Sequence, residues 1–220
     1  MSSDRAAASG SVDPFAVAYD YPLSTRDNIT LLKQFLNADM VAHGVRRWSP
    51  DLRYRNPQLH YQRILRMVEF LQRQPGPIWR VLRVYFRFRL HKVSVATGLS
   101  IPPGVFGPGL SIAHYGSIVV NSQARVGSFC RIHSATNIGV AGGGTPTIGD
   151  RVYIAPGAVL FGNITIGDNV VVGANAVVNR SFRSGVTVAG APAKVIAEQG
   201  SDDVMPEWYP PVSAAEAAEE

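Results

Sequence analysis

Residues 148–178 read IGDRVYIAPGAVLFGNITIGDNVVVGANAVV, and an aliphatic residue recurs at every sixth position of this stretch. The repeated positions are Ile148, Ile154, Leu160, Ile166, Val172 and Val178. An α-helix favours a period of 3.6 and a simple strand a period of 2, so neither explains a strict period of six. A period of six is typical of a chain that turns a corner after each short strand and stacks like residues in successive coils. The stretch therefore predicts a parallel β-helix.

A second set of positions supports the same fold. The residues four places after the aliphatic ones are also small or β-branched: Val152, Ala158, Ile164, Val170 and Ala176. The period extends backwards through Ile138, Ile132, Val126 and Val120. The single cysteine, Cys130, falls on one of these inward positions, which predicts a buried thiol rather than a disulfide or metal ligand.

One interruption breaks the period. Ile138 and Ile148 lie ten residues apart, so four extra residues must leave the coil. The interrupting segment is AGGGTP, residues 141–146. We expect it to form an outward loop, and glycine-rich loops of this kind are frequent functional elements.

The 220 residues divide into four segments by composition. Residues 1–26 are polar and predict a disordered or extended segment, whereas 27–92 carry helical patterns and predict an N-terminal helical domain. The β-helix is expected over 93–198, and 199–220 form an acidic C-terminal tail. The fold class is thus mainly β, a β-helix with an α-helical cap that protects its open strand edge.

Helices are predicted from near Asn28, after Pro57 and over residues 78–92. The last of these reads IWRVLRVYFRFRLHK, and the sequence suggests that Ile78, Leu82, Tyr85 and Phe86 face one side with arginines around the rest. Packing of this helix against the β-helix or a sister subunit is favoured over a position on a membrane surface.

Charge is distributed unevenly. The formal net charge is +5, but twelve of the 21 Lys and Arg residues lie between Arg46 and Lys92, where Asp51 and Glu69 are the only acids. This pattern favours a solvated helix face with sites for phosphorylated ligands; no nucleic-acid partner is expected, and contact with an anionic membrane stays open. The first 15 residues lack the apolar run of a secretory signal, and no segment approaches the roughly 18 apolar residues of a membrane span, so we expect a cytoplasmic protein.

Several motifs resemble those of the hexapeptide-repeat acyltransferases, and most closely the serine acetyltransferase branch. The motifs are GPGLSI at 107–112, HYGSIVV at 114–120, Ile138-Gly139 with the glycine-rich insert, and VAGAPAKVI at 188–196. The resemblance covers about residues 93–198. It implies a left-handed β-helix, acetyl-CoA as cosubstrate, active sites between neighbouring chains of a homotrimer, and a possible dimer of trimers through the helical domain.

The resemblance also assigns site residues. It places the general base at His114, because a neutral imidazole can take the proton of an attacking hydroxyl. His133 lies 19 residues further, close to one 18-residue coil, and is a second candidate for the catalytic site. Backbone N–H groups of Gly139 and the loop are candidates for stabilising the oxyanion. The resemblance suggests that Gly139, Gly173, Ala174, Ala191 and Lys194 bind the cofactor, with Lys194 placed to meet a CoA phosphate.

No metal is expected. Related β-helices form γ-type carbonic anhydrases, whose zinc site needs two histidines five residues apart and a third from the preceding coil. The five histidines of this chain contain no such pair.

Three positions depart from the serine-specific pattern. Ala113 stands where an Asp usually precedes the catalytic His, Leu99 where an orienting carboxylate is expected, and Gly144-Thr145-Pro146 where Arg-His-Pro is usual. A zwitterion without counter-charges is costly to desolvate, so the sequence favours O-acetylation of a sugar or glycoconjugate over free L-serine. A carbonyl or His133 is then needed to orient His114. N-acetylation of an amino sugar, serine O-acetylation and a non-catalytic β-helix scaffold stay open as alternatives.

Overall fold

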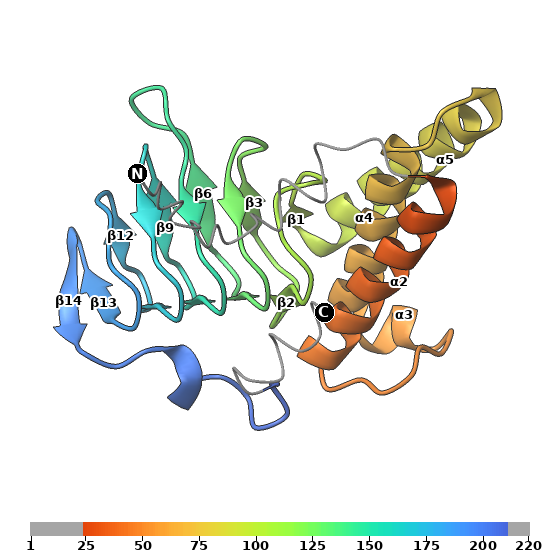
Figure 1. Cartoon of the computed structure of the whole chain (residues 1–220). Helices are drawn as coiled ribbons and strands as arrows, with labels where there is room; N and C mark the ends of the chain where they lie inside the picture. Colours follow the sequence, from red (N-terminus) through yellow and green to blue (C-terminus); the bar gives the residue numbers. More distant parts are fainter. Residues whose placement is uncertain (1–23, 211–220) are drawn as a thin grey trace, which may run out of the picture.

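The computed structural model describes residues 24–210 and consists of a helical cap followed by a parallel β-helix (Figure 1). The predicted fold class is therefore confirmed. The helices lie at one end of the β-helix, and the strands progress away from them to a C-terminal hairpin at the opposite end (Figure 1). The segment predicted as disordered, residues 1–26, lies outside the described residues up to position 23.

Among residues 24–210, four α-helices form the cap: α2 (Thr25–Ala42), α3 (Leu52–Arg55), α4 (Pro57–Gln72) and α5 (Pro77–Thr97). Helix α2 begins earlier than the sequence suggests, because the Ser24 hydroxyl accepts a hydrogen bond from Asp27 N and caps it. Helix α5 ends later, with Gly98 in the left-handed conformation (φ 70°) at its C-cap. The β-helix accordingly starts at Leu99 rather than near Val93.

The faces of α5 differ from the sequence-based assignment. The half-buried side chains are Trp79, Arg83, Phe86, Leu90, Val93 and Ser94. Of the four residues expected to share the packed face, only Phe86 lies on it, while Ile78, Leu82 and Tyr85 are exposed. The ring of Trp79 meets Phe70 of α4 edge-on at 5.9 Å, and α4 is the main neighbour of α5. The expectation failed because apolar residues surround most of this helix, so their positions alone do not define one face.

Strands of two to five residues form three sheets. The first sheet contains β1 (Leu99–Ser100), β3 (Ile118–Val120), β6 (Asn137–Gly139), β9 (Val159–Phe161) and β12 (Val177–Val178). The second contains β4 (Arg125–Val126), β7 (Thr147–Ile148) and β10 (Thr165–Ile166). The third contains β2 (Ser111–Ile112), β5 (Arg131–Ile132), β8 (Tyr153–Ile154), β11 (Val171–Val172), β13 (Thr187–Gly190) and β14 (Ala193–Ala197). Each full coil contributes one strand to each sheet in turn.

Strand register locates the four extra residues. Leu160 pairs with Val178, a separation of 178 − 160 = 18 residues, whereas Ile138 pairs with Leu160, a separation of 160 − 138 = 22 residues. The difference of four falls between β6 and β7. There Ala141 and Gly144 form a bridge with two 3.1 Å hydrogen bonds, and the segment leaves the coil as a narrow loop (Figure 1). The predicted extrusion is confirmed.

The core is a column of the repeated aliphatic residues. Ile132, Ile154 and Val172 stack in register through the third sheet and are fully buried. Cys130 is also fully buried, and burial raises the pKa of its thiol well above its usual range. This thiol is therefore a packing residue, as the repeat predicts.

The first part of the acidic tail is an ordered strap. After β14 the chain forms a short 3₁₀ helix (η1, Ser201–Asp203) and returns along the β-helix toward the helical cap (Figure 1). Arg151 binds Asp202 at 2.8 Å and the carbonyl of Pro210 at 2.7 Å, and the Tyr209 hydroxyl donates to Phe129 O at 2.9 Å. Residues 211–220 lie outside the described part of the chain.

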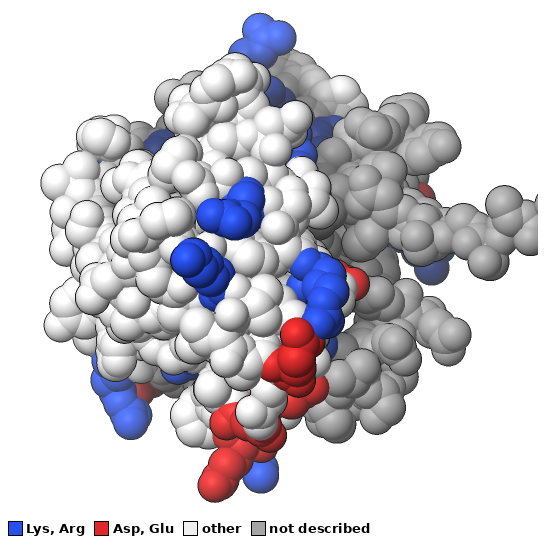
Figure 2. All heavy atoms as spheres, turned by 90° about the vertical axis from the view of Figure 1, so that its left-hand side faces the viewer, with Lys and Arg blue, Asp and Glu red and all other residues white. Residues whose placement is uncertain are grey.

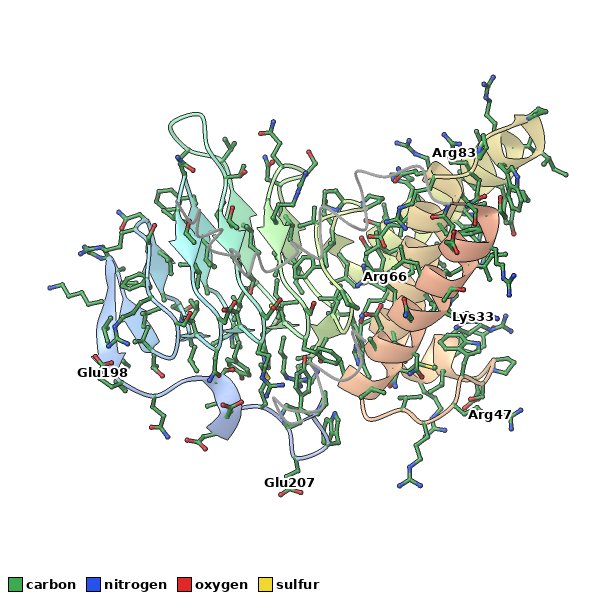
Figure 3. All side chains as sticks on the ribbon, in the orientation of Figure 1. Lys33, Arg47, Arg66, Arg83, Glu198 and Glu207 are labelled. Atoms are coloured by element: carbon green, nitrogen blue, oxygen red, sulfur yellow. The ribbon has the colours of Figure 1, made fainter. Side chains whose placement is uncertain are left out.

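A buried ionic network joins the cap to the first coils. Arg66 of α4 binds Asp39 of α2 at 2.9 Å and Glu69 at 3.1 Å, and its side chain is fully buried. The guanidinium also donates to the carbonyls of Phe106 and Gly107, at 2.9 and 2.6 Å. Figure 3 shows Arg66 where the helices meet the β-helix. All four partners bind Arg66 at once only when the cap is seated on the first coil.

The cap also carries a pH-sensitive histidine, His43, at the end of α2. Its Nε2 lies 2.7 Å from Gln62 Oε1, and burial lowers the pKa of His43 to about 4, only partly offset by this contact. The unfolded chain binds a proton near pH 6.5, so the free energy of unfolding falls as pH drops from 6.5 toward 4. We expect His43 to account for a loss of about 1–2 kcal/mol between pH 7 and pH 5.

Urea unfolding at the two pH values, compared with His43→Gln, measures this contribution. The variant keeps an amide donor for Gln62 but cannot titrate, so its stability should fall less over the same interval. Equal losses for both proteins would contradict the assignment.

Candidate active site

His114 and His133 lie at the same corner of the β-helix. His114 follows β2 and His133 follows β5, which pairs with β2 one coil further along. The two ring centroids are 6.3 Å apart, with an angle of 62° between the planes. A third ring, that of Tyr153, lies 5.0 Å from His133 on the next coil. The structure therefore brings together the two histidines expected from the sequence and adds a tyrosine.

The two histidines differ in environment. His114 is exposed, whereas His133 is half-buried and its Nε2 has no hydrogen-bond partner within residues 24–210. Burial, together with the charges of Arg131 and His114, lowers the pKa of His133 to about 4. His133 is thus neutral and weakly basic near pH 7, while His114 has the more accessible ring. The rings are too far apart for a hydrogen bond, so His133 does not orient His114 directly in this structure.

His133 belongs to a vertical row of otherwise small residues, here called the small-residue track. Its members are Ala113, His133, Ala155, Gly173 and Ala189. The backbone N–H of each of the first four members donates to a backbone carbonyl of the next coil along the chain, at 3.0, 3.1, 2.9 and 2.8 Å in turn. Successive coils are separated by the ordinary strand spacing, so the track forms a continuous line of little side-chain bulk leading away from the histidines. Such a line fits a thin, extended ligand such as a pantetheine arm.

The other residues expected to bind the cofactor lie further along this line. Gly173 is part of the track, Ala174 is the exposed residue after it, and Ala191 and Lys194 are exposed in the terminal hairpin of β13 and β14. A Cβ on Gly173 would lie 2.9 Å from the Ala189 Cβ, so coil stacking itself requires glycine there. Figure 2 views this end of the β-helix, where a few Lys and Arg side chains stand on the face and Asp and Glu side chains gather toward its lower edge. Exposed cations at this end suit the phosphates of an extended ligand.

Gly139, which was also expected at the active site, lies at a different corner of the β-helix from the histidines. It ends β6, and the loop at 141–146 follows it at the corner between the first and second sheets. The histidines lie at the preceding corner, between the third and first sheets. Within one chain the structure therefore does not bring Gly139 or the loop to His114.

The sequence-based assignment of Leu99 is wrong. Leu99 is fully buried in the core of the first coil, and a carboxylate at that position would point away from any surface site. Its neighbour Ser100 is exposed and pairs with Val119 in the first sheet. Since side chains alternate along a strand, position 100 rather than 99 faces outward.

Sequence reasoning missed Arg131 and Ser111. Arg131 is half-buried two residues before His133, and its Nη1 donates to Ser111 Oγ at 2.7 Å. No carboxylate pairs with Arg131 in the part of the chain that the structure describes. A signal was available in the sequence, because Ser111 and Arg131 lie two residues before track members and pair across neighbouring strands. Ser111 itself is fully buried, and its hydroxyl donates to Ala42 O at 3.2 Å. A cation in this position can attract an anionic group to the histidine corner.

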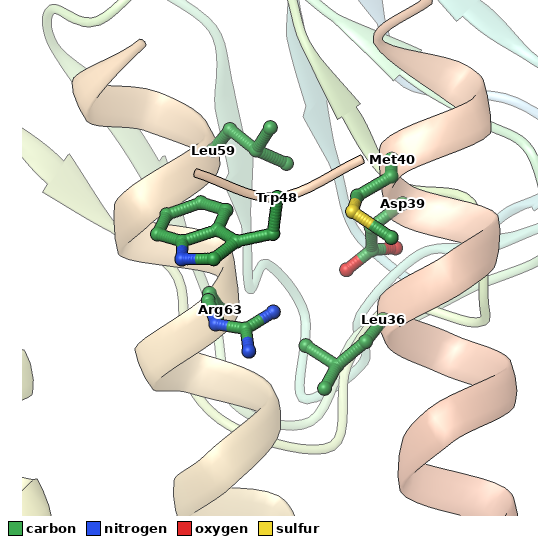
Figure 4. Close-up of a pocket in the computed structure, with 6 residues that line it drawn as sticks. All are labelled: Leu36, Asp39, Met40, Trp48, Leu59 and Arg63. Atoms are coloured by element: carbon green, nitrogen blue, oxygen red, sulfur yellow. The ribbon is translucent and has the colours of Figure 1, made fainter. Parts of the chain in front are cut away.

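The described residues contain no metal-binding cluster, and the pocket in the cap is too small for a substrate. No group of three or more His, Cys, Asp or Glu side chains that could hold a metal ion occurs among residues 24–210. A small pocket between α2 and α4, of about 10 Å³, has room for about one water molecule and lies in the cap (Figure 4). Its lining residues are Leu36, Asp39, Met40, Trp48, Leu59 and Arg63.

Comparisons with known proteins identify the family and the fold. Residues 145–180 match the family described as bacterial transferase hexapeptide (six repeats). A serine acetyltransferase of Helicobacter pylori strain J99 is 32% identical over 172 residues, which is 75% of this chain and 94% of that protein. The chain belongs to the serine acetyltransferase family. A second family member, from Synechococcus elongatus, is 37% identical over 124 residues, 54% of this chain and 51% of that protein. The chain thus spans about half the length of this curated relative.

Solved serine acetyltransferases have the same architecture. The crystal structure of the Brucella abortus enzyme matches with a TM-score of 0.63 and 25% identity, over 86% of this chain and 74% of that one. The soybean apoenzyme matches with a TM-score of 0.63 and 25% identity, over 83% and 81%. The matches extend beyond the hexapeptide coils, so the helical cap belongs to the shared fold of the serine acetyltransferase family.

Proposed function

We propose that the protein is an acetyl-CoA-dependent O-acetyltransferase in which His114 is the general base and L-serine is the first candidate acceptor. The observation that carries the proposal is the exposed His114 at the start of the small-residue track, with exposed cations at the far end. Membership of the serine acetyltransferase family supports it. A scaffold without catalytic function would not need this combination.

Each residue has a separate part in the reaction. Acetyl-CoA supplies a thioester carbonyl as the electrophile. An imidazole nitrogen of His114 takes the proton from the acceptor hydroxyl as its oxygen bonds to that carbonyl carbon, and returns a proton to the departing thiolate. His133 stays neutral because its pKa is about 4, so no second positive charge opposes protonation of His114. The track holds the pantetheine arm, and Lys194 pairs with a phosphate.

Serine is better supported than a sugar as the acceptor. The relatives are named serine acetyltransferases, and no comparison supports the sugar or glycoconjugate expected from the sequence. One of the three arguments against serine also fails, since Leu99 faces the core and never belonged to the site. Arg131, which donates to Ser111 Oγ and has no carboxylate partner among residues 24–210, offers a counter-charge for the acceptor's carboxylate.

The oxyanion site needs a second chain. Gly139 and the loop at 141–146 lie one corner away from the histidines of their own chain. A neighbouring copy in a trimer can present its loop to this corner, which completes a site that one chain leaves open. We therefore propose a homotrimer with active sites between subunits.

An acceptor screen tests the function directly. Thiol release from acetyl-CoA is measured with L-serine, homoserine, glucosamine and neutral sugars at equal concentration. We expect turnover with L-serine and a raised KM for serine in Arg131→Met, with kcat changed less. Turnover with sugars but not with L-serine would overturn the choice of acceptor and leave the proposed acetyl transfer in place. Tight binding of acetyl-CoA without transfer to any acceptor would favour a non-catalytic scaffold.

A further inference from the structure

The outer face of α5 is an exposed apolar stripe. Val81, Val84, Phe88 and Val95 are each between 58% and 71% exposed. Their spacings of three, four and seven residues place them on one side of an α-helix, about opposite the face of Trp79, Phe86 and Leu90 that packs on α4. Ile78 and Tyr85 widen the stripe at one edge. A helix this apolar on its solvent side is unusual for a surface with no partner.

Arg80 and Arg87 border the stripe on one side and Arg89 on the other, while Lys92 lies within it, four residues after Phe88 and three before Val95. Arg80, Arg87, Arg89 and Lys92 are exposed, and the helix contains no acid. The sequence has no Asp or Glu at all between Glu69 and Asp150. Lys92 lies 5.3 Å from the centre of the Phe88 ring, and Arg89 donates to the Tyr85 hydroxyl at 3.0 Å, so these cations lie directly beside the apolar groups. The face thus combines apolar contact area with uniform positive charge.

The positive charge around the stripe favours an anionic partner over a second copy of this chain. Pairing the stripe with the same stripe of a second copy would bring two sets of cations together with no acid on either helix. A surface that is both apolar and anionic matches the face without this repulsion. None of the helices in residues 24–210 has the length and apolar character needed to span a bilayer, and α5 has 21 residues with charge on both flanks. Amphipathic helices with basic flanks bind in the plane of a membrane interface rather than across the bilayer.

We propose that the outer face of α5 docks the protein peripherally on an anionic lipid bilayer. The apolar stripe enters the boundary between headgroups and acyl chains, and the bordering arginines and Lys92 meet lipid phosphates. Figure 1 shows that α5 begins at the far end of the cap and runs back toward β1, so the docked face belongs to the cap rather than to the terminal hairpin. The proposal is independent of the acetyl-transfer chemistry.

Vesicle sedimentation with the full chain tests it. Binding is compared between vesicles of phosphatidylcholine and vesicles of phosphatidylcholine mixed with phosphatidylglycerol. We expect binding to the anionic vesicles only, weakened by added salt. The double variant Arg80→Glu/Arg87→Glu should lower the partition constant at least about tenfold, since each cation near the surface contributes roughly a factor of five. The double variant Phe88→Ser/Val84→Ser should also weaken vesicle binding. At high salt, where the charge interactions are screened, it should bind less than the unaltered protein does.

The matched control is Arg53→Glu/Arg55→Glu, which makes the same charge change at exposed positions of α3. It should leave the partition constant nearly unchanged. An equal fall of the partition constant in this control would show that binding depends only on the net charge of the protein, and would overturn the proposal. Absence of vesicle binding by the unaltered protein, with Phe88→Ser/Val84→Ser lowering the mass in sedimentation equilibrium, would instead make the stripe an interface between copies. Circular dichroism confirms that each variant is folded.

Discussion

His114→Ala is expected to lower kcat for acetyl transfer by about 10²- to 10⁴-fold, because the hydroxyl of the acceptor then loses its proton to water rather than to a positioned imidazole. His114 is exposed at a corner, so its removal should leave the thermal stability almost unchanged. Binding of acetyl-CoA should persist, since the small-residue track and Lys194 are untouched. Initial rates and the dissociation constant for CoA measure the two effects separately.

Two histidine variants serve as controls for this result. His91→Ala alters an exposed imidazole on α5, outside the track, and should keep the full rate. His133→Ala removes a ring with a pKa of about 4 that cannot compete for the proton, so we expect a smaller loss than for His114→Ala. A full rate for His114→Ala, or an equal loss in His91→Ala, would refute the assignment of the base.

Much of the β-helix was predictable because its signal is local and repeated. A period of six fixes which residues face the core, and the register confirms it from Ile132 to Val172. The ten-residue gap after Ile138 located the loop for the same reason, since a close-packed core cannot absorb four additional residues. His114 and His133 were expected to be neighbours from their separation of about one coil, and their rings are 6.3 Å apart.

Features that depend on contacts between distant segments were not predictable. The order of residues 199–210 comes from Arg151 and Phe129, which meet the strap 51 and 80 positions away along the chain. Arg131 carried no family motif, and its place beside the histidines depends on strand pairing. The face of α5 was misassigned because the apolar residues exceed what α4 can cover. That excess is itself the observation behind the proposed membrane contact.

Arg66→Met is expected to lower the free energy of unfolding by about 3–5 kcal/mol, the largest loss of stability that we anticipate for a single residue. Met fills most of the space of Arg but leaves Asp39 and Glu69 buried without their cation, and two backbone carbonyls without a donor. Burial already raises the pKa of Asp39, and Arg66 opposes this rise. Removing Arg66 should raise that pKa further.

The pH dependence separates this network from simple loss of packing. An Asp with a raised pKa in the folded state loses stability as pH rises above its unfolded value near 4, so the difference between Arg66→Met and the unaltered protein should be larger at pH 7 than at pH 4. Urea unfolding at both pH values provides the measurement. Arg55→Met is the matched control, because it breaks an exposed ion pair with Asp51 and should change stability by less than about 0.5 kcal/mol. A loss below about 1 kcal/mol in Arg66→Met would mean that the network only orients the cap, and that apolar packing holds it on the first coil.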